Sequence, residues 1–270
     1  MAGHLSPQGL FIDDLPSDEG PDAPLVVLVH GAMDRHTSFA RVRARLMVTC
    51  HVVSYDRRGY AGSRAAEPLA AHVLEHVDDL ESVVAERGCT VVGHSYGGAV
   101  VLAFAERRPD LVKSVVAYEP PMPWTESWTL DGGGTSHFDD VTPEQAAEAF
   151  LRRQIGDRRF ELLPLKVRED LLKDGKALVA EVTAIRHDPP PFDPAKLLMP
   201  VLVVCGQATT ERHRRASADL ARLLPAGSLH EVAEATHGGH QSHPAEFSRL
   251  ILAAVGLAAE PAADRPPALV

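Results

Sequence analysis

Short runs of apolar, mostly β-branched residues recur along the chain, separated by longer segments with apolar residues every three or four positions. The short runs occupy residues 25–29, 51–55, 90–92, 111–118 and 201–205, and residues 9–13 and 228–232 suit shorter strands. The longer, helix-like segments cover 38–47, 69–87, 99–108, 211–224 and 244–255. Unbroken apolar runs suit strands buried on both faces, and strands that alternate with helices form parallel sheets. The pattern therefore predicts an α/β fold with a doubly wound, mostly parallel sheet.

The alternation of strands and helices is interrupted between residues 122 and 197. Apolar strand runs stop there, and a helix signal, Thr142-Pro143-Glu144, opens a series of helical stretches that ends near residue 186. Three consecutive prolines, 189–191, mark the return to the sheet. We expect residues 1–121 and 198–258 to form the core, residues 122–197 to form an inserted helical cap, and residues 259–270 to be a flexible tail.

The sharpest motif lies where one apolar run meets the helix that follows it. The sequence Gly93-His94-Ser95-Tyr96-Gly97 leaves about one residue for the turn between strand and helix. So tight a turn strains the serine backbone and brings the flanking positions too close for a Cβ, which explains the glycines. The arrangement predicts a nucleophile elbow that presents the Ser95 hydroxyl at the end of the strand.

Two further strand ends carry motifs. His30-Gly31 follows the run 25–29, and residues 56–63 read Asp-Arg-Arg-Gly-Tyr-Ala-Gly-Ser after the run 51–55. With the elbow, these motifs make the chain resemble the α/β-hydrolase superfamily over its whole length outside the cap. The resemblance implies a serine hydrolase in which the loop 56–63 is structural. It also implies an oxyanion hole made by the backbone N–H groups of Tyr96 and of Ala32, or less favourably Met33.

A serine nucleophile needs a histidine base and an acid that orients it. His237, on the loop after the last strand, is the expected base, with His240 and His243 as rivals. Family members most often carry the acid at the position of Thr209, where this chain has none. Some carry it one strand earlier, which matches Glu119, and we favour Glu119 over Glu211 or no acid at all.

The three histidines of that loop lack a metal-binding motif such as His-Glu-x-x-His, and we expect no metal and no cofactor. Apolar side chains near the motifs are candidates for a substrate pocket, although ordinary packing explains each of them equally well. They are Met33, Phe39, Met122, Trp124 and Trp128.

Composition restricts the partners. With a net charge of −10 the chain has no dominant basic face, so we expect no nucleic-acid partner. The pairs Arg57-Arg58, Arg152-Arg153 and Arg214-Arg215 read as solvated surface, as does an acidic helix face of Glu75, Asp78, Asp79, Glu81 and Glu86. No apolar run approaches membrane-spanning length, and the first 24 residues lack signal-peptide features. The three cysteines suit core packing as thiols.

These observations predict a cytoplasmic enzyme, monomer or homodimer, that acts on a small molecule. The expected reaction is hydrolysis of an ester, thioester or lactone through an acyl-enzyme on Ser95. Two alternatives stay open, because a fold does not determine a reaction. One is a non-hydrolytic enzyme on the same scaffold, such as a lyase, a cyclase or a cofactor-free oxidative enzyme. The other is a binding protein with an inactive triad.

Overall fold

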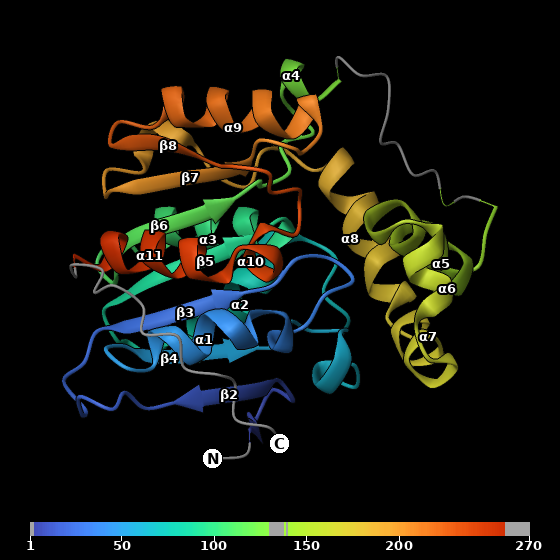
Figure 1. Cartoon of the computed structure of the whole chain (residues 1–270), viewed down its shortest axis with the longest axis horizontal. Coiled ribbons are helices and arrows are strands. Elements are labelled where there is room, and N and C mark those ends of the chain that lie inside the picture. Colours follow the sequence, from blue (N-terminus) through green and yellow to red (C-terminus); the bar gives the residue numbers. More distant parts are fainter. Residues whose placement is uncertain (1–2, 130–137, 139, 257–270) are drawn as a thin grey trace.

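The fold is built on one eight-stranded sheet with the strand order β1-β2-β4-β3-β5-β6-β7-β8. A computed structural model describes residues 3–129, 138 and 140–256 of the chain (Figure 1). The pairings from β4 to β8 are all parallel, and β1 and β2 add an antiparallel edge. The strands are β1 (His4–Leu5), β2 (Phe11–Leu15), β3 (Leu25–Val29), β4 (His51–Tyr55), β5 (Cys89–His94), β6 (Val112–Tyr118), β7 (Val201–Gly206) and β8 (Gly227–Val232).

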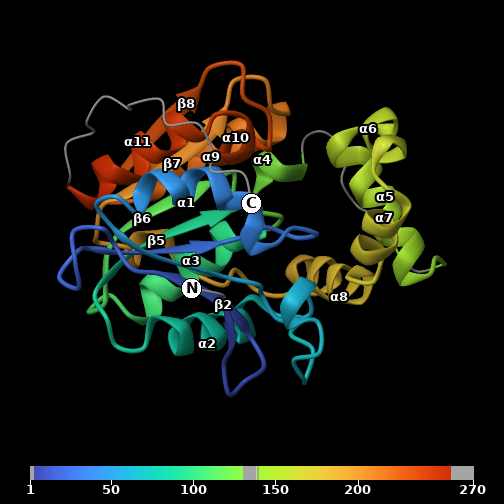
Figure 2. The ribbon, with the colours of Figure 1, turned by 60° about the horizontal axis from the view of Figure 1, so that its bottom comes forward.

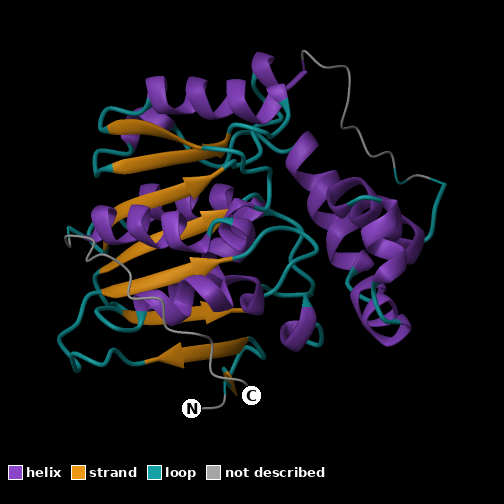
Figure 3. Cartoon of the chain, viewed as in Figure 1, coloured by secondary structure: helices purple, strands orange, loops and turns teal. Residues whose placement is uncertain are grey.

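Helices cover both faces of the sheet, and the predicted doubly wound α/β fold is confirmed (Figure 3). The core helices are α1 (Ala40–Leu46), α2 (Val73–Val84), α3 (Tyr96–Arg107), α4 (Glu126–Thr129), α9 (Glu211–Leu223), α10 (Gly239–Ser242) and α11 (Pro244–Val255). Three 3₁₀ turns occupy η1 (His36–Phe39), η2 (Ala61–Ser63) and η3 (Pro194–Lys196). Among the described residues, no helix is both long and apolar enough to cross a membrane.

Alternate side chains of the central strands enter two separate cores. Val26 and Leu28 of β3 pack with α1 and α11 on one face, whereas Val27 and Val29 pack with α2, α3 and α9 on the other. All five residues of β3 are buried, which is why this strand reads as an unbroken apolar run. The three cysteines are buried free thiols.

The inserted cap lies beyond the carboxyl ends of the parallel strands (Figure 2). Its helices are α5 (Pro143–Ile155), α6 (Asp157–Leu162), α7 (Leu165–Leu172) and α8 (Gly175–His187), all inside the predicted insertion 122–197. The two ends of that insertion pack on the core instead, because Met122, Phe192 and Leu197 belong to the larger core cluster. The predicted tail 259–270 lies outside the described residues.

A buried ion pair fastens the cap to the core. Both guanidinium NH groups of Arg57 donate to the carboxylate of Glu181 on α8, at 2.5 and 3.2 Å. The hydroxyl of Tyr60 donates to the same carboxylate at 2.7 Å, and Nε2 of His76 lies 2.9 Å from it. Arg57 also donates to the backbone oxygens of His30 and Gly31. The prediction that Arg57 is solvated was therefore wrong, because its charge is fully buried and paired with a residue far along the chain.

One member of the predicted acidic surface of α2 is also buried. Asp79 is 3% exposed and accepts hydrogen bonds from the guanidinium of Arg58. It shares the inner side of α2 with Leu80 and Val83, so the helix turns one carboxylate inward. Arg58 supplies the charge that makes this burial tolerable.

Candidate active site

The turn that carries Ser95 has the strained geometry expected of a nucleophile elbow. Ser95 joins β5 to α3 with φ 52° and ψ −123°, a backbone conformation that costs about 1–3 kcal/mol. Its N–H donates to the carbonyl of Tyr118 at 2.8 Å, which holds the turn against β6. A Cβ on Gly93 would lie 2.3 Å from the carbonyl oxygen of Gly97, and one on Gly97 would lie 2.3 Å from that of Val29. Only glycine fits at either position.

Glu119 and His237 meet at the carboxyl ends of the neighbouring strands. Oε2 of Glu119 lies 2.5 Å from Nδ1 of His237. Because an ionised carboxylate only accepts hydrogen bonds, Nδ1 carries a proton, and Nε2 is the nitrogen left to exchange one. Glu119 is completely buried. Oε1 accepts from the N–H of Gly206 at 2.8 Å, and Oε2 accepts from the hydroxyl of Thr209 at 2.9 Å.

These contacts set the charge of Glu119. Burial by itself would raise the pKa of this carboxyl. The hydrogen bond and charge of His237, together with the N–H of Gly206, outweigh burial and hold the pKa below its usual value. Glu119 is thus ionised at neutral pH, as a residue that stabilises an imidazolium must be. Its backbone φ of 45° is strained, a feature it shares with Ser95.

The loop that carries His237 is attached to the two central strands. The hydroxyl of Tyr118 donates to the carbonyl of Thr236 at 2.5 Å. Nε2 of His94 lies 2.8 Å from the carbonyl oxygen of His237, and the two rings have centroids 4.8 Å apart. The histidine loop therefore lies directly against the residue that precedes Ser95.

The rival residues have other partners. His240 is 1% exposed and faces Asp34, and Nδ1 of His243 lies 2.8 Å from the hydroxyl of Ser242. Glu211 forms exposed ion pairs with Arg214 and Arg215 on its own helix. Of the described candidates, His237 and Glu119 are the histidine and the acid that the fold brings together.

One residue of this site was missed by the sequence analysis. The ring of His213, on α9, stacks on His237 with centroids 4.5 Å apart and an interplanar angle of 19°. Its Nδ1 lies 3.8 Å from Oε2 of Glu119, and burial lowers the pKa of His213 to about 3, so the ring is neutral. Its only sequence signal is its position three residues after Thr210, whose side chain caps α9.

The loop after β3 lies next to the elbow. A Cβ on Gly31 would lie 2.9 Å from Cβ of Ser95, so the chain passes Ser95 in van der Waals contact. Ala32 follows this contact, and Met33 adopts a positive φ of 53°. Tyr96 begins α3, and its N–H is one of the helix-end donors that have no partner within the helix.

The five predicted pocket residues fall into different environments. Phe39 is fully buried in the core beneath α1 and α11, so it serves packing and not a pocket. Met33 packs against apolar residues of the cap. Met122 and Trp124 line a pocket of about 460 Å³ whose lining does not include Ser95, Glu119 or His237.

Trp128 is the predicted pocket residue that contacts His213. Its ring meets that of His213 edge to face, with centroids 5.3 Å apart.

Comparison with known proteins agrees with this geometry. A model of the alpha/beta hydrolase family matches residues 26–250. The chain belongs to this family. The resemblance inferred from the motifs is thereby confirmed.

Individual relatives are distant from this chain. The chain is 32% identical over 118 residues to a probable oxidoreductase, EphD, from Mycobacterium tuberculosis. The aligned residues are 42% of this chain and 20% of EphD. The chain therefore spans about a fifth of that relative's length. It is 25% identical over 225 residues to 2-(acetamidomethylene)succinate hydrolase from Mesorhizobium japonicum, covering 77% and 79% of the two proteins.

Solved structures of the alpha/beta hydrolase family share the fold. The enol-lactonase from Burkholderia xenovorans LB400 superposes with a TM-score of 0.70 at 20% identity, over 92% of this chain and 96% of that one. These similarities agree with the membership of the chain in the family.

Proposed function

We propose that the protein is a serine hydrolase that cleaves an ester, thioester or lactone of a small organic substrate. The observation that carries the proposal is the 2.5 Å contact between Glu119 and His237, on a loop anchored to His94 beside Ser95. In the proposed triad, Glu119 is the acid, His237 is the base and Ser95, the residue after His94, is the nucleophile. An enol-lactonase and a 2-(acetamidomethylene)succinate hydrolase are among the similar proteins, which is consistent with this proposal.

The proposed reaction begins when Oγ of Ser95 attacks the carbonyl carbon and its proton passes to Nε2 of His237. Glu119 stays ionised and stabilises the imidazolium. The N–H groups of Tyr96 and Ala32 would donate to the oxyanion, and one such donor typically changes the rate by about 10²–10³. The leaving group takes the proton from His237, and water repeats the sequence to release the acid.

An active-site phosphonate probe tests the nucleophile. Folded wild-type protein is expected to form a covalent adduct that peptide mass spectrometry places on Ser95. Ser95→Ala is the matched variant and should remain unlabelled. Absence of an adduct on folded wild-type protein would refute the hydrolase proposal and favour an inactive binding protein.

A substrate panel tests the reaction. Aryl esters, thioesters and lactones are compared with non-ester substrates, and products are identified by mass spectrometry. Turnover of an ester-type substrate that is lost in Ser95→Ala supports the proposal. Turnover only of non-ester substrates would assign the fold to lyase, cyclase or oxidative chemistry instead.

A further inference from the structure

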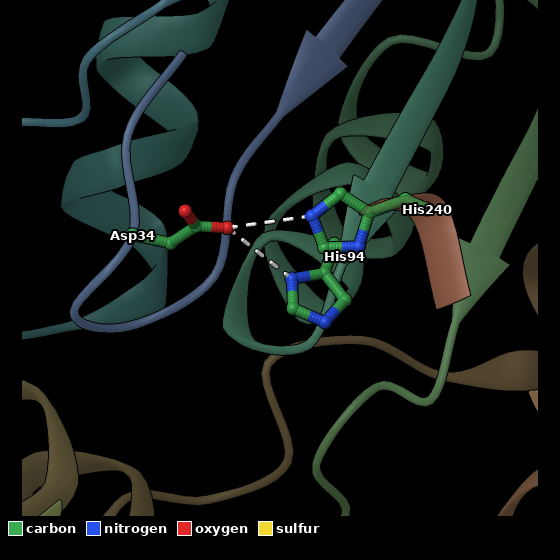
Figure 4. A group of neighbouring side chains, drawn as sticks. All are labelled: Asp34, His94 and His240. Carbon is green, nitrogen blue, oxygen red and sulfur yellow. Dashed lines mark ion pairs between the residues drawn. The ribbon is translucent and has the colours of Figure 1, made fainter. Parts of the chain in front are cut away.

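A second cluster of ligand-type side chains lies beside the proposed triad and takes no part in it. Asp34 follows β3, His94 ends β5 and His240 lies in α10, and the three side chains point toward one another (Figure 4). Oδ2 of Asp34 lies 3.7 Å from Nδ1 of His94 and 3.6 Å from Nε2 of His240. All three facing atoms are buried and have no hydrogen-bond partner among the described residues.

The protonation of His94 makes this arrangement unusual. Its Nε2 lies 2.8 Å from the carbonyl oxygen of His237, and a carbonyl only accepts, so Nε2 carries the proton. In the uncharged tautomer that this hydrogen bond selects, Nδ1 presents its lone pair to a carboxylate oxygen of Asp34. A lone pair and an anion repel each other unless a positive charge lies between them.

The distances between these atoms distinguish a direct hydrogen bond, a bridging water and a bound cation. A direct N–H···O hydrogen bond needs about 2.7–3.2 Å, so 3.6 and 3.7 Å are too long. A water bonded at about 2.8 Å to both atoms of either pair would have to hold them at an angle of about 80°, well below the tetrahedral value. An ion at about 2.1 Å from both atoms holds them at about 120°, close to the geometry of a four-coordinate site.

From this geometry we infer that Asp34, His94 and His240 form a binding site for a divalent transition-metal ion of the Zn²⁺ class. Two imidazoles and one carboxylate are a donor set that such ions accept, whereas Ca²⁺ and Mg²⁺ prefer oxygen ligands alone. The hydrogen bond from His94 to a backbone carbonyl is the usual support of a ligating histidine. Oδ1 of Asp34 likewise accepts from the N–H of Arg35 at 2.9 Å.

A neighbouring group of Glu119, His213 and His237 has ligand atoms similarly close together. Its carboxylate already accepts from His237, Gly206 and Thr209. The Asp34 group is the better site because its facing atoms are unpartnered.

The position of the site suggests what the ion does. Asp34 lies two residues after Ala32, His94 precedes Ser95, and His240 lies three residues after His237. One ion would tie together the three segments that carry the proposed oxyanion donor, nucleophile and base. The inference itself does not depend on the proposed hydrolase activity, because it concerns binding and stability.

Metal titration of the full chain, prepared without a polyhistidine tag and stripped with a chelator, tests the inference. Calorimetry with Zn²⁺ is expected to give one ion per chain with a Kd of about 1 μM or below. Co²⁺ should give the visible absorption bands of a low-symmetry site with nitrogen ligands. Zn²⁺ at a hundredfold excess over Kd should raise Tm by about 5–10 °C.

Two variants locate the site. His240→Phe keeps a ring of similar shape against Phe39 and Phe247 and removes the ligand nitrogen. Asp34→Asn keeps the size and removes the charge. Each should weaken Zn²⁺ binding by at least about a hundredfold and abolish the rise in Tm, and His240→Phe should fold at least as well as wild type without metal.

Control variants exclude other binding sites. His230→Gln removes a surface histidine paired with Glu246 and should leave Zn²⁺ binding unchanged. His213→Phe alters the neighbouring group and should also leave the affinity unchanged. No binding to wild type, binding retained in both site variants, or binding lost in His213→Phe but not in His240→Phe would each overturn the inference.

Discussion

The position of the proposed triad acid gives the sharpest test of the site, because a carboxylate can also be placed at residue 209. Glu119→Gln removes the charge that faces Nδ1 of His237 and nearly preserves the side-chain shape. With charge centres about 4 Å apart and an effective dielectric constant near 20, the lost attraction to the imidazolium is about 4 kcal/mol. The expected result is a fall in kcat of about 10³-fold with little change in KM, since the imidazolium forms after binding.

Rescue from Thr209 distinguishes a catalytic acid from a merely structural carboxylate. The hydroxyl of Thr209 lies 2.9 Å from Oε2 of Glu119, the oxygen that contacts His237. A carboxylate at position 209 can therefore reach the same Nδ1–H. The double variant Glu119→Gln/Thr209→Asp should regain at least about tenfold of the lost kcat, whereas Glu119→Gln/Thr209→Asn should regain none.

The assay is steady-state kinetics on the best ester-type substrate from the panel, with circular dichroism and Tm to confirm folding. A kcat of Glu119→Gln within about threefold of wild type would contradict a catalytic role for Glu119. That role is also contradicted if Asp and Asn at position 209 behave alike in the double variants. In that case Glu119 holds the loops together and does not act on His237 electrostatically.

Three further predictions concern stability. Glu181→Gln leaves the fully buried Arg57 unpaired and should lower the free energy of unfolding by about 3–5 kcal/mol in urea titrations, whereas Glu211→Gln in an exposed pair should cost under about 1 kcal/mol. Burial alone would raise the pKa of Glu181, but Arg57 and His76 lower it to about 2, below the usual 4.5. Its stabilisation is therefore complete above pH 4.5 and is lost on acidification, so between pH 5.5 and 3 wild type should lose about 2 kcal/mol more than Glu181→Gln. Gly97→Ala should destabilise by about 1–3 kcal/mol or prevent folding, whereas Gly238→Ala, with open space around its Cβ position, should leave Tm unchanged.

The sheet and the elbow were predictable because their signals are local. The run Leu25–Val29 is apolar at every position, and β3 is buried at every position. The glycines two residues before and after Ser95 predict a turn too tight for a Cβ at these positions. In the structure, a Cβ on Gly97 would lie 2.3 Å from the carbonyl oxygen of Val29. The signals for such a strand and such a turn lie in adjacent residues, so both elements can be predicted from the sequence.

The residues that were misjudged depend on partners far along the chain. In the sequence, Arg57 looks like half of a surface arginine pair. Its burial depends on the carboxylate of Glu181, which lies 124 positions later on a cap helix. Asp34 lies in a polar loop with no motif of its own, and its relation to His94 and His240 exists only after β3, β5 and α10 converge. His213 reads as one polar residue in a charged helix, although that helix turns it onto His237.

The strand order explains how Glu119 can take the place of the acid that is missing at position 209 in the proposed triad. β6 and β7 are parallel neighbours in register, with Tyr118 opposite Val204, so the residues that follow them end at the same edge of the sheet. Glu119 uses this proximity directly, because its N–H donates to the carbonyl of Val204 and its carboxylate accepts from the N–H of Gly206. A carboxylate placed after either strand can meet the same imidazole, since β8 and the histidine loop lie next to β7. The strand order therefore permits the acid to occupy either position, and the glutamate, one methylene longer than aspartate, spans the extra distance from the farther strand.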